Sequence, residues 1–135
     1  PEQTISDSLE LLPFRHGPAR VALATGAPIV PCVGWGSQRF VGPGRRPSRP
    51  FALPVTVRFS APIRPLPDED AAALTARLRA RMESELDHVQ RTYPGGTPAG
   101  APWVPARLGG GAPPHDAVLR QHAERQRDWD EGVSG

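Results

Sequence analysis

Four histidines and one cysteine are the side chains of this 135-residue chain best suited to act as bases, nucleophiles or metal ligands. The histidines are dispersed and have no acidic cluster at ligand spacing around them, so we expect surface or capping roles and no metal site. Cys32 lies in an apolar run without a neighbouring base, which predicts a small buried side chain rather than a nucleophile. A lone cysteine forms no internal disulfide, and this favours a reducing, cytoplasmic setting. The histidines are His16, His88, His115 and His122.

Several motifs of well-known enzyme classes are absent from the sequence. It contains no Walker phosphate loop, no GxGxxG opening a helix, no GxSxG elbow and no HExxH pair. No apolar run approaches the length of a membrane-spanning helix. Nucleotide hydrolysis, dinucleotide binding, serine hydrolysis and zinc proteolysis of these types are therefore not expected.

All 16 basic residues are arginine, and their surroundings differ between the two halves of the chain. Residues 1–67 hold eight Arg and three acidic residues, a net +5, whereas residues 68–135 hold eight Arg and eleven acidic residues, a net −3. No acid occurs in residues 11–67. Such a basic half favours an anionic partner such as phosphate, acidic lipid or nucleic acid, although a merely solvated basic surface is the alternative.

Short motifs follow one another in a defined order over residues 1–63. A PEQTIS segment at 1–6 precedes LLPFRHG at 11–17, AR at 19–20 and GAPIVP at 26–31. This series resembles the lysophospholipid and glycerol-phosphate acyltransferase family. In that family a PEGTRS-type motif leads through a Phe-basic-x-Gly segment to a helix and then to a VPIVPV-type strand. The later WVPARLGG segment also looks like the tails of some bacterial members.

The resemblance implies an enzyme of phospholipid biosynthesis. Such an enzyme transfers a fatty acyl group from acyl-CoA or acyl-carrier protein to the hydroxyl of a lysophosphatidate-like acceptor, and it needs no cofactor. The implied setting is cytoplasmic and peripheral, on the anionic inner face of the cell membrane. The implied partners are therefore the acceptor, the acyl-thioester donor and this membrane surface, with no nucleic acid.

One family motif has no counterpart in this chain. The family's general base is the histidine of an HxxxxD motif, whose aspartate orients it. No histidine here has an aspartate five residues later. Because that motif lies upstream of PEGT in the family, the chain resembles the C-terminal half of such an enzyme. We expect it to be inactive alone, and we assign it no catalytic residue.

The family's phosphate-binding motif is altered. Gln3 replaces its glycine, and Ile5 or Asp7 stands where an arginine would bind phosphate bidentately. Arg15 and Arg20 could bind the phosphate in place of the missing arginine. The resemblance thus implies four acceptor-binding residues, Glu2, Thr4, Arg15 and Arg20, while loop or capping roles for the first two are equally consistent with the sequence.

Two helices and two strands are predicted in the first part of the chain. Ala19–Thr25 has a proline near its first turn and a glycine past its end, as short helices do. Pro28–Trp35 is an apolar run suited to a strand buried on both faces, although Pro31 indicates a bulge or a sheet edge. Val55–Phe59 alternates as a strand does. Glu69–Thr92 is predicted to be an amphipathic helix. Its apolar stripe consists of Leu74, Leu78, Met82, Leu86 and Val89.

These elements predict an α/β fold with a partial mixed sheet flanked by helices. Residues 1–92 would form the C-terminal part of an acyltransferase-like domain. Residues 93–135 would form a Pro/Gly-rich, partly disordered tail with a short helix over 115–131. Unpaired sheet edges would remain where the missing half belongs, and such edges promote self-association.

A non-enzymatic basic module is the alternative. In it, the segment from Arg39 to Arg58 would clamp acidic lipid or nucleic acid. Nucleic-acid binding calls for aromatic side chains between the arginines, and Phe40 and Phe51 give little support. Anionic lipid is the more consistent partner.

Overall fold

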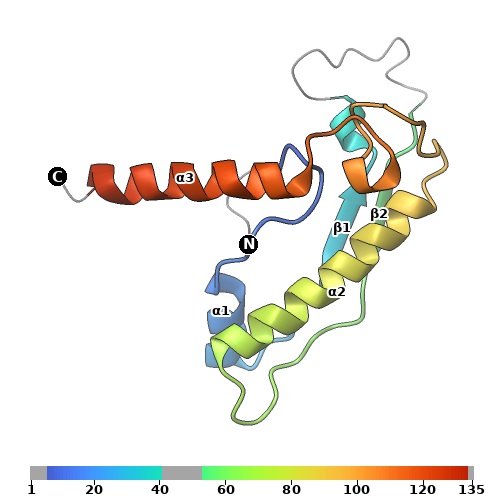
Figure 1. Ribbon diagram of the computed structural model, residues 1–135. Helices are drawn as coiled ribbons and strands as arrows, with labels where there is room; N and C mark the ends of the chain where they lie inside the picture. The colour runs from blue at the N-terminus through green and yellow to red at the C-terminus, as the bar shows by residue number, and fades with distance from the viewer. Residues whose placement is uncertain (1–5, 41–52, 134–135) are drawn as a thin grey trace. The chain divides into compact units, whose positions relative to one another are not determined.

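The computed structural model describes residues 6–40 and 53–133 of the chain, and their side chains as far as Trp129 (Figure 1). The described residues form two compact units. The first comprises 13–40 and 53–96, and the second comprises 6–12 and 97–133.

The first unit is a small α/β fold, as the sequence predicted in outline. Its two strands pair antiparallel, with Cys32 opposite Phe59 and Trp35 opposite Thr56. Ile29 and Ile63 extend this pairing as an isolated bridge, with N···O distances of 2.8 and 2.7 Å. In chain order the elements are α1 (Gly17–Thr25), β1 (Cys32–Trp35), η1 (Ser37–Arg39), β2 (Thr56–Phe59) and α2 (Ala71–Arg91).

Helix α2 confirms the longest predicted element. Its N-cap is Asp70, whose Oδ1 accepts the N–H of Ala73 at 2.7 Å. Leu74 and Leu78 are buried against α1, which supplies Ala19 and Ala22 to the same cluster. Small α1 side chains let the two helices approach closely, and Ile63 from the far end of the strand pairing completes the cluster.

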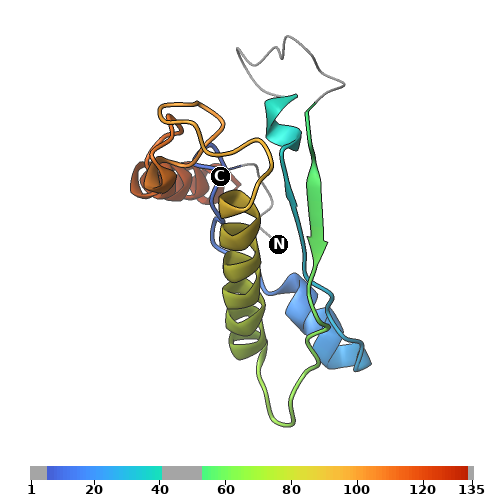
Figure 2. The ribbon, with the colours of Figure 1, turned by 90° about the vertical axis from the view of Figure 1, so that its right-hand side faces the viewer.

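Among the described residues, α2 covers one face of the strand pair and nothing covers the other face. Figures 1 and 2 show α2 running alongside both strands. Val33 and Trp35 are each 5% exposed on the covered face. Arg58, opposite Val33 in the register, forms an ion pair with Glu85 of α2 on that face.

The opposite face of the strand pair is exposed, which corrects two predictions. Val57 and Phe59 are 57% and 69% exposed, and they share this face with their register partners Gly34 and Cys32. The run Pro28–Trp35 is therefore not buried on both faces. Cys32 is exposed rather than buried, because its side chain points away from α2.

The second unit is built around α3 (His115–Val133), which confirms the short helix predicted over 115–131. The helix packs through Val118, which is buried, as are Leu12 and Val104 of the same unit. A 3-10 turn, η3 (Ala106–Leu108), precedes Gly110. A side chain at Gly110 would meet the Val104 carbonyl oxygen at 2.0 Å, so the close approach of these two segments requires glycine.

Candidate anion-binding site

The two described acceptor-binding candidates lie at the start of α1, and both are exposed. Arg15 precedes the helix, and Arg20 lies in its first turn with its N–H donating to the His16 carbonyl at 2.9 Å. Pro18 favours helix formation at this end. Glu2 and Thr4, the other two candidates, lie outside the described residues.

His16 lies between these arginines and is held by α2. It occupies the N-cap position of α1, yet its ring caps no α1 backbone N–H. Instead its Nδ1 lies 3.0 Å from Oγ1 of Thr75, a buried hydroxyl on α2. That hydroxyl also donates to the carbonyl of Ala71 at 2.6 Å. The contact between α1 and α2 thus fixes the orientation of an exposed imidazole.

Helix α2 adds a further cation one turn beyond Thr75. The guanidinium carbon of Arg79 lies 5.6 Å from the centre of the Phe14 ring, within the range of cation–π attraction. Arg79 is also paired with Glu83 at 2.8 Å. Phe14 thereby brings Arg79 to the segment that carries Arg15 and His16.

We call Arg15, His16, Arg20 and Arg79 the α1 cationic cluster. The carboxylates nearest to it along α2 are already occupied, since Glu83 pairs with Arg79 and Asp70 caps the helix. Guanidinium and imidazole groups without a local excess of carboxylates form a setting that attracts anions, and arginine suits phosphate in particular. The residue types of the cluster are suited to binding an anion such as phosphate.

Two other arginines of the acid-free segment make structural contacts within the first unit. Arg39 donates to the Tyr93 hydroxyl at 3.3 Å, and Arg58 is paired with Glu85. Arg64 is exposed. The remaining three, Arg45, Arg46 and Arg49, lie outside the described residues, as does Phe51, so the loop proposed as a lipid or nucleic-acid clamp is not described.

Two carboxylates outside the cluster have lowered pKa values because arginines hold them ionised. The ion pair with Arg58 lowers the pKa of Glu85 below its ordinary value of 4.5. Arg77, at 2.7 Å, and the N–H of Leu66, at 3.0 Å, lower the pKa of Glu69 in the same way. The first pair links α2 to β2, and the second links α2 to the loop that precedes it, so both have a structural role.

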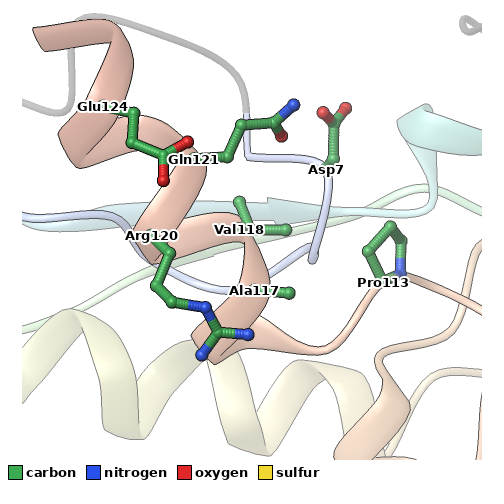
Figure 3. Close-up of a pocket in the computed structure, with 7 residues that line it drawn as sticks. All are labelled: Asp7, Pro113, Ala117, Val118, Arg120, Gln121 and Glu124. Carbon is green, nitrogen blue, oxygen red and sulfur yellow. The ribbon is translucent and has the colours of Figure 1, made fainter.

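The second unit contains a separate hollow of about 380 Å³, shown in Figure 3. Asp7 and Glu124 line it and would repel phosphate. Arg120 lines it too, but it pairs with Asp116 at 2.8 Å and points away from the Asp7 carboxylate (Figure 3). The arginine missing from the family motif is therefore not replaced at this hollow.

A serine and a histidine form a hydrogen bond in the same unit. Ser8 Oγ lies 2.9 Å from Nδ1 of His115 and 2.8 Å from Oγ of Ser6. Ser8 has no exposed surface, so its hydroxyl is inaccessible to a substrate carbonyl. We interpret this chain of hydrogen bonds as the structural link between residues 6–12 and the start of α3.

No family model, curated protein or solved structure matches this chain. Among the described residues, no group of three or more His, Cys, Asp or Glu side chains could hold a metal ion. The α1 cationic cluster is therefore the candidate site that rests on both residue chemistry and geometry.

Sequence reasoning proposed Arg15 and Arg20 as acceptor-binding residues and did not propose His16 or Arg79. His16 was expected to have a surface or capping role, and no role was assigned to Arg79 from the sequence. The sequence features that could have pointed to His16 and Arg79 are that His16 directly follows Arg15 and that Thr75 and Arg79 are one helical turn apart. Neither signal reveals that His16 contacts Thr75 or that Arg79 contacts Phe14. Near the end of β1, Trp35 is buried, and Gln38 Oε1 accepts the N–H of Gly36 at 2.7 Å.

Proposed function

We propose that the chain is the C-terminal part of an acyltransferase domain of the lysophospholipid and glycerol-phosphate acyltransferase type. The ordered motifs over residues 1–63 support this proposal. In the reaction, the acceptor hydroxyl oxygen forms an ester bond with the acyl carbonyl carbon, the carbon–sulfur bond of the thioester breaks, and the hydroxyl proton ends on the thiol. The donor is acyl-CoA or acyl-carrier protein.

The observation that carries the proposal is the exposed apolar face of the strand pair. Val30, Val55, Val57 and Phe59 are all at least half exposed, and the last two share a face with Cys32. A sheet of two strands needs further strands or a second covering layer for independent stability. We therefore propose that β1 and β2 belong to a larger mixed sheet flanked by helices, whose remaining elements cover this face.

The α1 cationic cluster would bind the acceptor phosphate in this enzyme. Arg15 and Arg20 replace the arginine that the altered PEQTIS motif lacks, and Glu2 and Thr4 would complete the site. The general base would come from an HxxxxD motif that these 135 residues do not contain. We therefore expect the chain by itself to form no phosphatidate from lysophosphatidate and acyl-CoA.

We further propose that the protein works peripherally on the anionic cytoplasmic face of the membrane. The acid-free, arginine-rich segment of residues 11–67 supports attraction to such a surface. In the part of the chain that the structure describes, no helix combines the length and apolarity that crossing a bilayer requires.

Binding of lysophosphatidate by the chain tests the proposed site. The double substitution Arg15→Gln and Arg20→Gln should weaken the affinity by about tenfold or more, because hydrogen bonds to charged groups contribute roughly 1.5–3 kcal/mol each. Arg64→Gln is the matched control, since Arg64 is also an exposed arginine of the acid-free segment. Equal affinities for the double variant and the control would contradict the proposal, as would phosphatidate formation by the isolated chain.

A further inference from the structure

We draw no further inference here: the strongest candidate, the exposed apolar face of the strand pair around Cys32, Val57 and Phe59, already carries the proposed function, and nothing in the described residues shows what covers it.

Discussion

At the scale of single residues, Leu74 is a core side chain of the first unit. It has no exposed surface and packs with Ala19, Ala22 and Ile63. Leu74→Ala should lower the free energy of unfolding by about 2–5 kcal/mol, because the helices cannot fully close the cavity. Urea denaturation measures the change. Leu66→Ala is the control: Leu66 is 54% exposed, so its effect should stay within about 0.5 kcal/mol. Similar losses in both variants would contradict this assignment of the core.

Burial was predicted correctly for residues whose position on a single helix determines whether they are buried. Leu74, Leu78 and Val89 were placed on the buried stripe of α2 by their spacing, and all three are buried. Cys32 was predicted to be buried and is exposed, since the number of covered faces of a strand is set by its distant neighbours. The partner of His16 lies 59 residues further along the chain, and no local pattern identifies it.

At the scale of elements, two ion pairs make the contacts of α2 with β2 and with the loop that precedes α2 sensitive to acid. Arg58 lowers the pKa of Glu85, and Arg77 lowers that of Glu69. A carboxyl whose folded-state pKa is depressed contributes stability above its unfolded-state pKa and loses it as the pH falls through the folded value. The free energy of unfolding should therefore decline as the pH drops below 4.5, the ordinary value. Urea denaturation across this pH range measures the decline.

The arginine partners provide the matched control for this pH dependence. Replacing both Arg58 and Arg77 by Gln should flatten the acid-dependent loss, because the two carboxyl groups then titrate closer to their ordinary range. Arg64→Gln should leave the slope unchanged, as no carboxylate contacts the Arg64 side chain in the described residues. An unchanged slope in the double variant would assign the acid sensitivity to other groups.

The exposed face of the strand pair predicts self-association of the isolated chain. Val57 and Phe59 present an apolar surface beside strand edges that no further strand of the described residues pairs with, and such edges favour contact with other chains. Val57→Ser with Phe59→Ser should lower the sedimentation coefficient at high protein concentration towards that of a monomer. Val21→Ser, at a 62% exposed position of α1, should not. A wild-type chain that sediments as a monomer would count against the proposal that this face is covered in a larger domain.

Elements with a strong local pattern were predicted well. Helix α2 was expected over 69–92 and spans Ala71–Arg91, and β2 was expected over 55–59 and spans Thr56–Phe59. An amphipathic stripe with an Asp cap, and an alternating run of β-branched residues, favour their structures locally. The apolar run before Trp35 has no alternation, so its shortening to Cys32–Trp35 and its single buried face could not be predicted from local pattern.

At the scale of the whole molecule, charge attracts both candidate partner classes, and the exposed apolar face distinguishes them. Residues 11–67 carry eight arginines and no acid, so both anionic lipid and nucleic acid should be attracted at low salt. The exposed apolar face adds a favourable interaction with lipid that salt does not screen. Nucleic acid gains less, because the acid-free segment has few aromatic side chains on which bases could stack. We therefore expect co-sedimentation with phosphatidylglycerol vesicles to persist at salt concentrations that abolish binding to a single-stranded oligonucleotide.

Arginine substitutions locate the lipid-binding surface and decide between the two classes. Replacing Arg45, Arg46 and Arg49 by Gln removes three charges from the acid-free segment and should reduce vesicle binding by about 1 kcal/mol for each charge that lies near the surface. The matched control removes three charges from the acidic half, Arg81, Arg125 and Arg127, and should have a smaller effect because acidic residues already surround them. Oligonucleotide binding that outlasts vesicle binding as salt rises would support the basic-module alternative. An equal loss in both triple variants would show that only net charge matters, and the membrane-facing role of residues 11–67 would then be wrong.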